Sequence, residues 1–268
     1  MTTLTATPVT ARRVTSLSAV NAERIKFLTL PSYTISALAT LALLIGLGVL
    51  SSFAMVWQAE DGGPALGPVV PGLVLDGVQT AQVLLAIVAT LFVTSEYAQG
   101  TIQTSVIAVP KRIPILMAKA ATVASAGLLI GVAGSATLMF AAPAILDQAG
   151  IGVDWSAQTP VQVILGCGLY LALIAVLALS LGVLIRNTVG AFLTVVALLT
   201  VAPLLLSAVP IEWVAKATSY LPTIAGILVL YPDSPMSPLT PWQGLGVLAA
   251  WATAGMVAAA LTLRFRDA

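Results

Sequence analysis

Long apolar blocks alternate with short polar segments along most of this chain. Each block is about as long as the roughly 20 helical residues needed to cross a ~30 Å hydrocarbon core. The blocks are continuous, whereas a membrane barrel would show alternating segments of about 10 residues, and lipid offers the backbone no hydrogen-bond partners. The pattern therefore predicts an all-α, polytopic membrane protein with six transmembrane helices. These spans cover about residues 33–57, 72–94, 115–145, 161–185, 190–208 and 242–263.

A seventh apolar stretch, residues 213–231, is not counted as a span, because Lys216, Pro222 and Gly226 interrupt it. It belongs to the 209–241 connection on the extracytoplasmic side. We favour a short helix that dips into the outer leaflet, which requires protein to cover its irregular backbone. The alternative is a loop folded over the outer face.

Composition agrees with this assignment. Hydrophobic residues make up 59% of the 268 residues and charged residues only 8%, whereas soluble domains carry about 25% charged residues. A water-soluble domain of this length would need a charged surface that this chain lacks.

The basic residues are concentrated on one side of the predicted topology. Only Lys216 falls on the other side, where seven of the ten acidic residues also lie or come close. Basic residues resist translocation, so both termini are expected in the cytoplasm. The ten basic residues assigned to the cytoplasmic side are Arg12, Arg13, Arg24, Lys26, Lys111, Arg112, Lys119, Arg186, Arg264 and Arg266. The net charge of +1 gives no reason to expect nucleic-acid binding.

Several kinds of chemistry are excluded by residue type. The chain has no histidine and a single cysteine, Cys167, so no internal disulfide, His/Cys metal site or Ser-His catalytic pair is possible. The span interiors carry almost no ionisable groups, although ion-coupled carriers usually keep such groups at mid-membrane. A phosphate-binding loop of the GxxxxGK[ST] type is also absent. We expect neither an enzyme nor a metal or cofactor bound by this chain, and energy for uphill transport would have to come from a partner.

The most informative polar segment is the loop of residues 95–114. Gly100 permits a sharp turn after the second span, and Thr101 can cap a new helix. Pro110 would end that helix, and Lys111 and Arg112 would hold the loop at an anionic membrane surface. The pattern predicts a short helix across the cytoplasmic mouth. The alternative is an ordinary short loop with a basic anchor.

The ordered set of residues around this loop resembles the pattern of type-2 ABC-transporter permeases, the membrane-spanning subunits of ATP-driven transporters. The set consists of Glu96-Tyr97, Gly100-Thr101, Pro110-Lys111-Arg112 and Lys119. The six-span layout extends the resemblance over nearly the whole chain, as topology only. The resemblance implies that this loop is a coupling helix that docks on a separate ATP-hydrolysing subunit, which would hold ATP and Mg.

The segment before the first span also fits this resemblance. Residues 14–30 place Val14, Leu17, Val20, Ile25, Phe27 and Leu28 on roughly one helical face, although Asn21 and Arg24 interrupt it. We expect a cytoplasmic N-terminal segment, residues 1–32, that contains an amphipathic helix. In the resembled family such a connecting helix also touches the ATPase. The transmembrane domain follows as residues 33–263, and residues 264–268 form a cytoplasmic tail.

Two further sets of residues are candidates for packing or transport. Gly127, Gly131 and Ser135 form a small-residue stripe that permits close helix approach, within the subunit or between subunits. Asp76, Gln79 and Thr80 place polar groups near the outer end of the second span. They could line a substrate path or form hydrogen bonds between helices.

These observations predict a multi-pass permease subunit of a bacterial plasma-membrane ABC transporter. Two permease subunits, identical or different, would form one path, with a cytosolic ATP-binding subunit as partner. The resemblance favours export of a drug, peptide, lipid or glycan. The alternative is an ATP-independent facilitator or a structural, immunity-type membrane protein.

Overall fold

A computed structural model describes residues 16–61, 67–98, 112–156, 158–231 and 237–265. This part of the chain is helical and contains no strand, apart from an isolated bridge between Val69 and Val153. Six of its helical segments are long and apolar enough to cross a membrane. The predicted all-α, polytopic membrane fold is confirmed.

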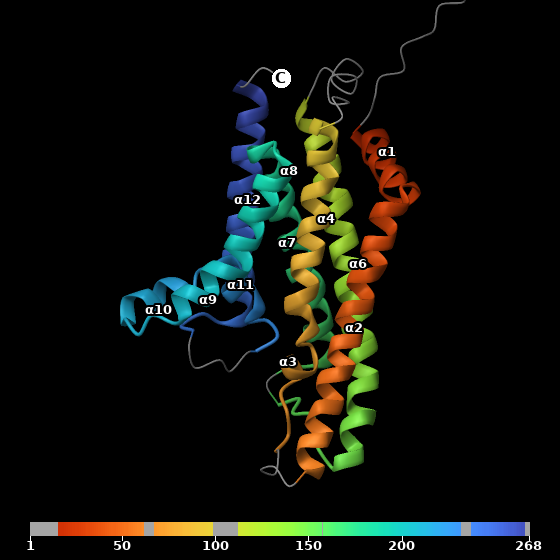
Figure 1. Ribbon diagram of the computed structural model, residues 1–268, viewed down its shortest axis with the longest axis vertical. Coiled ribbons are helices and arrows are strands. Elements are labelled where there is room, and N and C mark those ends of the chain that lie inside the picture. The colour runs from red at the N-terminus through yellow and green to blue at the C-terminus, as the bar shows by residue number, and fades with distance from the viewer. Residues whose placement is uncertain (1–15, 62–66, 99–111, 157, 232–236, 266–268) are drawn as a thin grey trace, which may run out of the picture.

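The helices stand roughly side by side, and α1 lies at the same end of the bundle as the C-terminal end of α12 (Figure 1). We call this end the terminal end. The main helices, in chain order, are α1 (Ser16–Thr29), α2 (Pro31–Glu60), α3 (Pro71–Val74), α4 (Gly77–Ala98), α6 (Arg112–Leu146), α7 (Pro160–Ile185), α8 (Thr188–Val196), α9 (Ala202–Ser207), α10 (Glu212–Thr218), α11 (Pro222–Ile227) and α12 (Pro241–Phe265). A 3-10 turn, η1 (Asp147–Ala149), follows α6, and a π-helical turn, η2 (Ala197–Val201), joins α8 to α9.

The second span differs from the prediction, which placed one helix over residues 72–94. The structure has two helices there, because α3 ends at Val74 and α4 begins at Gly77. Gly77 lies against α2, where an added Cβ would come within 2.5 Å of the Leu44 carbonyl oxygen. The break lets the chain turn into the bundle at a position where only glycine permits this approach.

Helix α7 is the centre of the bundle and packs against α4, α6, α8 and α12. The predicted small-residue stripe lies on α6 at its contact with α7. A Cβ on Gly127 would lie 2.7 Å from the Leu171 carbonyl oxygen, and one on Gly131 would lie 2.7 Å from the Cα of Gly168. Ser135 is fully buried. The stripe therefore brings two helices of the same chain together.

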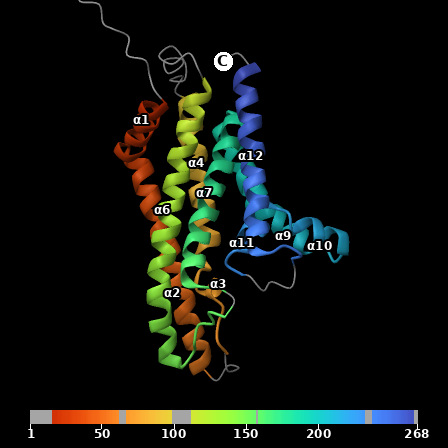
Figure 2. The same cartoon turned by 180° about the vertical axis from the view of Figure 1, so that it is seen from behind.

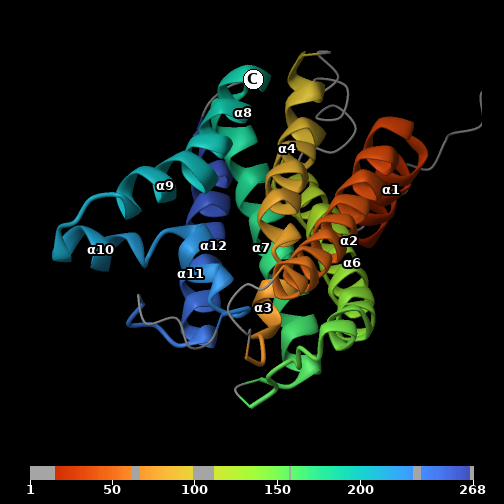
Figure 3. The ribbon, with the colours of Figure 1, turned by 60° about the horizontal axis from the view of Figure 1, so that its bottom comes forward.

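The fifth span bends away from the others. Pro203 has no N–H and cannot bond the carbonyl of Leu199 four residues earlier, and a wide π-turn occupies this position. The hydroxyl of Thr223 in α11 donates to that carbonyl at 2.9 Å. Beyond the turn, α9 and α10 project sideways from the bundle (Figure 3). We call η2, α9 and α10, residues 197–218, the lateral arm.

The 209–241 connection contains two short helices with different surroundings. In α10, Trp213 is 71% exposed, whereas α11 packs on α12 and α7. A Cβ on Gly226 of α11 would lie 2.7 Å from the Tyr170 ring. The backbone of α11 is thus covered by protein, which the re-entrant interpretation of this connection requires.

Candidate functional site

A cluster of charged side chains joins three helices at the terminal end of the bundle. Helix α1 contributes Glu23 and Lys26, which are three residues apart and so share a helical face. Glu96 comes from the last turns of α4, and Lys119 from the second turn of α6. We call these four residues the charge cluster.

Lys119 is at the centre of the charge cluster. Its Nζ donates to Glu96 Oε1 at 2.6 Å and to Glu23 Oε2 at 2.8 Å. The Nζ of Lys26 also donates to Glu96 Oε1. Glu96 therefore binds α1 and α6 through one carboxylate oxygen, and Lys119 binds α1 and α4 through one ammonium group.

The two central members are withdrawn from solvent. The side chains of Lys119 and Glu96 are 4% and 9% exposed, whereas that of Lys26 is 36% exposed. Charges taken out of water are stable only when they are paired and hydrogen-bonded. The three helices must therefore keep this mutual arrangement while both charges stay buried.

Three aromatic rings pack beside the charge cluster, on the side that faces the interior of the bundle. The ring of Phe92 meets Phe27 and Tyr33 edge to face, with centroid distances of 5.5 and 5.2 Å. Lys119 Nζ lies 4.7 Å from the centroid of the Phe92 ring, a cation–π distance. The Tyr33 and Ser95 hydroxyls are hydrogen-bonded at 2.9 Å. Helices α1, α2 and α4 are thus held together directly beneath the charges.

The turn between α1 and α2 directs α1 over this cluster. Leu30 has extended backbone angles because it precedes Pro31, which is the first residue of α2. The apolar residues that the sequence places on one face of this segment differ in burial. Phe27 is buried, but Ile25 and Leu28 are 61% and 57% exposed, because packing around Phe92 selects the face that carries Phe27.

The structure brings together two of the sequence-predicted coupling residues, Glu96 and Lys119. Tyr97 lies in the last turn of α4, and Arg112 is the first residue of α6. The predicted coupling helix, with Gly100, Thr101, Pro110 and Lys111, lies outside the described residues. Residues 99–111, for which that helix is predicted, connect α4 to α6, the two helices that Glu96 and Lys119 join.

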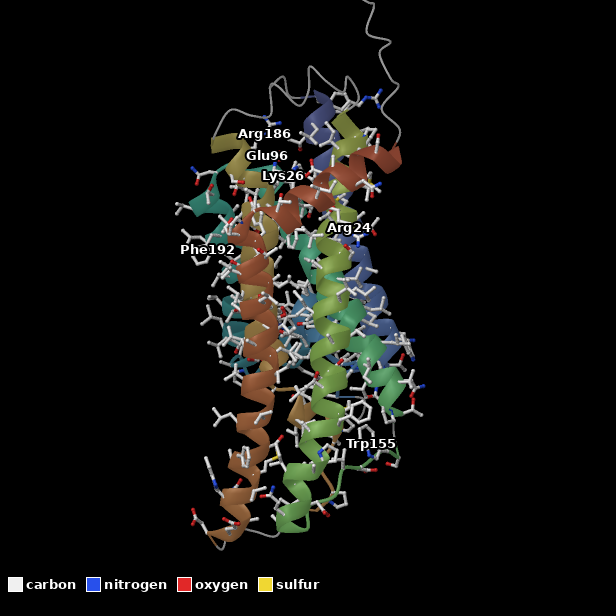
Figure 4. The ribbon with its side chains drawn as sticks, turned by 90° about the vertical axis from the view of Figure 1, so that its right-hand side faces the viewer. Arg24, Lys26, Glu96, Trp155, Arg186 and Phe192 are labelled. Atoms are coloured by element: carbon white, nitrogen blue, oxygen red, sulfur yellow. The ribbon has the colours of Figure 1, made fainter. Side chains whose placement is uncertain are left out.

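Sequence reasoning missed Glu23, Lys26 and Phe92 as members of the site. The only local signal was the Glu23–Lys26 spacing, which is common on solvated helices and did not single them out. Figure 4 shows Lys26 and Glu96 at the same end of the bundle as Arg186, which lies in the turn between α7 and α8.

The predicted polar set near the start of α4 is not part of this cluster. Asp76, Gln79 and Thr80 are all exposed, and within the described residues their side chains form no hydrogen bond with another helix. The polar residue that does join helices there is Gln82, which is buried and accepts a hydrogen bond from the Tyr170 hydroxyl of α7. Among the residues that the structure describes, no group of three or more Asp, Glu or Cys side chains could hold a metal ion.

The fold defines a class, the helical multi-pass membrane proteins, and in this chain a buried charge cluster lies at one end of the bundle. Comparison with known proteins adds no narrower assignment: no family model matches the chain, and no curated protein matches it significantly.

Proposed function

We propose that this chain is the membrane-spanning subunit of an ATP-driven ABC exporter in the bacterial plasma membrane, and that a separate cytosolic subunit binds ATP and Mg. The observation that carries the proposal is the charge cluster of Glu23, Lys26, Glu96 and Lys119. Ionisable side chains buried within a membrane protein are costly and are often found at functional sites. The chain itself has no phosphate-binding loop.

The cluster supports this function through its position. Residues 99–111 connect α4 to α6, and Glu96 and Lys119 lie close to the two ends of that connection. A soluble partner that pushes on the connection displaces α4 and α6 together, because their charged side chains are bonded. Helix α1 follows, since Glu23 and Lys26 belong to the same network.

We further propose that two such membrane subunits together form the transport path, and the lateral arm supports this. The most apolar part of the fifth span is 22% buried within the chain, the lowest share of the six spans, and the first and sixth follow at 28%. Leu204, Leu205 and Trp213 of the arm are 68%, 62% and 71% exposed. Large projecting side chains of this kind are suited to packing against a second subunit in the membrane.

The first experiment is affinity purification of the full chain in mild detergent. We expect a protein with a GxxxxGK[ST] motif to copurify, and the complex to hydrolyse ATP. If no such protein is recovered from native membranes, the proposal fails and the ATP-independent alternatives take its place.

The second experiment tests the cluster in that complex. We expect Glu96→Ala to lower ATP hydrolysis coupled to transport, with normal membrane insertion. Glu60→Ala, which removes an exposed glutamate at the C-terminal end of α2, is the matched control and should leave hydrolysis unchanged. Gly100→Pro should act like Glu96→Ala by blocking the turn into the loop. Wild-type hydrolysis in both Glu96→Ala and Gly100→Pro would contradict the coupling role.

A further inference from the structure

An apolar groove of about 510 Å³ runs along one side of the bundle, between α6 and α12. Its walls are residues 113–124 of α6 and 252–260 of α12, and its floor is Leu173 and Val176 of α7. Thr253 is the one polar residue among those that line it. Figure 2 shows α6, α7 and α12 next to one another on this side of the molecule.

Alanines in both walls widen the groove between the larger side chains that line the rest of it. Ala120, Ala121 and Ala124 line it from α6, and Ala252 and Ala260 from α12. Both helices pack extensively on α7 but little on each other. The space between them is left without protein atoms, and the lining loses van der Waals contacts unless another molecule fills it.

The length and position of the groove match one leaflet of a bilayer. The twelve residues from Ile113 to Ala124 rise about 16 Å along α6 at 1.5 Å per residue. Half of a ~30 Å hydrocarbon core is about 15 Å. The groove lies in the half of the bundle near the terminal end, where α6 begins and α12 ends.

Positive charge flanks the same end of the groove. Arg264 lies in the last turn of α12, four residues beyond Ala260, and is exposed. Basic residues at a membrane surface attract anionic lipid headgroups.

From the groove and its charged end we propose that this chain binds one anionic phospholipid. An acyl chain lies along the groove, and the headgroup phosphate lies beside Arg264. The proposal does not depend on the transporter assignment. With both termini in the cytoplasm, as the charge distribution predicts, this lipid lies in the inner leaflet.

A second copy of the chain suits this groove less well. Packed helices approach to about 8–10 Å between their axes and interdigitate large side chains, and five of the eleven wall residues are alanines. Apolar side chains are more exposed on the lateral arm, where Leu204, Leu205 and Trp213 are 68%, 62% and 71% exposed, than in the groove, where Met117 is 58% exposed. A narrow, flexible hydrocarbon chain can reach the floor formed by α7, and a whole helix cannot.

The test uses the full-length chain in phosphatidylcholine vesicles with a trace of photoreactive lipid. Two probes carry the same diazirine acyl chain, one on phosphatidylglycerol and one on phosphatidylcholine, and mass spectrometry locates the labelled peptides. We expect phosphatidylglycerol to label residues 113–124 and 252–260 about fivefold more than phosphatidylcholine, the preference that one basic residue near the surface provides. Equal labelling by the two lipids would identify non-selective boundary lipid and overturn the proposal.

Two pairs of variants test the acyl-chain site and the headgroup site separately. Ala124→Phe fills the groove and should abolish its labelling, whereas Ala136→Phe, at a partly buried alanine of α6 outside the groove, should preserve it. Arg264→Gln should remove the preference for phosphatidylglycerol but keep labelling of the groove. Arg24→Gln, at an exposed arginine of α1, should keep both. Unchanged labelling in Ala124→Phe, or an unchanged preference in Arg264→Gln, would contradict the proposal.

A final measurement tests whether a second copy of the protein occupies the groove. Thr253→Cys places an exposed thiol at the groove, and the native Cys167 is fully buried and does not compete. We expect no disulfide-linked dimer when membranes are oxidised. Efficient formation of such a dimer would show that protein, not lipid, covers the groove.

Discussion

Lysine and glutamate meet in two places in the described part of this molecule, and the surroundings differ. In the charge cluster, Lys119 is 4% exposed at the junction of three helices. On the lateral arm, Lys216 binds Glu212 at a similar distance, 2.7 Å, but the two side chains are 69% and 85% exposed. The pair on the arm joins residues four positions apart in the same helix, α10, whereas the cluster joins residues of α1, α4 and α6.

The comparison shows that the contribution of an ion pair to stability depends on its burial and on the helices that it connects. Exposed pairs contribute about 0–1 kcal/mol, because solvent competes with each partner. Removal of one partner from a buried pair costs about 3–5 kcal/mol, because the other charge is left without compensation. The following predictions test this contrast, from the largest expected effect to the smallest.

Lys119→Met should have the largest effect. It leaves Glu23 and Glu96 close together with Lys26 as the remaining cation of the cluster, and we expect a loss of about 3–5 kcal/mol of stability. The measurement is the thermal unfolding midpoint of the purified protein in detergent. Lys119→Arg keeps the charge and should lose less. A wild-type midpoint in Lys119→Met would show that the cluster does not hold the three helices together.

Gly131→Ala should have the second largest effect. The new Cβ would lie 2.7 Å from the backbone Cα of Gly168, so α6 and α7 must separate. Overpacking of this kind costs about 1–3 kcal/mol. Gly46→Ala in α2 is the matched control, because its Cβ meets nothing within 4 Å and alanine favours helix. The same unfolding assay should show opposite signs for the two variants, and equal midpoints would rule out the close α6–α7 approach.

Tyr170→Phe should cost about 1 kcal/mol, because it leaves the buried Gln82 side chain without its hydroxyl donor. Adding Gln82→Leu should recover part of this loss, since no buried polar group then lacks its partner. A double-mutant cycle of unfolding midpoints measures the coupling. Strict additivity would mean that this hydrogen bond does not connect α4 to α7.

Lys216→Ala should have the smallest effect, within about 0.5 kcal/mol, because the pair with Glu212 is exposed and screened by salt. Its unfolding midpoint should stay near that of the wild type at low and high salt. A loss of stability comparable to that of Lys119→Met would mean that a second subunit covers this pair in the native protein.

Six helical spans could be predicted from the chain because burial in lipid depends on local composition. The boundaries agree closely for the fourth span, predicted as 161–185 and observed as Pro160–Ile185. The second span was less predictable. The break before Gly77 results from the close approach of Gly77 to Leu44 of α2. The sequence around Gly77 does not show that this contact forms.

Two of the four residues of the charge cluster were predictable from the sequence. Glu96 and Lys119 stand out because they are charges next to apolar spans. Glu23 and Lys26 resemble ordinary residues of a polar helix until α1 folds over α4 and α6. The Lys119–Glu23 bond joins residues 96 positions apart, and no local pattern encodes that distance.

Hydropathy therefore accounts for the class of this protein, and tertiary contacts account for its particular features. The number of spans depends on the free energy of moving each segment into lipid, which is a property of that segment alone. The charge cluster, the close contact of α6 with α7 and the groove beside α12 depend on which helices become neighbours. That choice is made by packing among residues far apart in the chain, where backbone carbonyls, alanines and paired charges decide how closely two helices can approach.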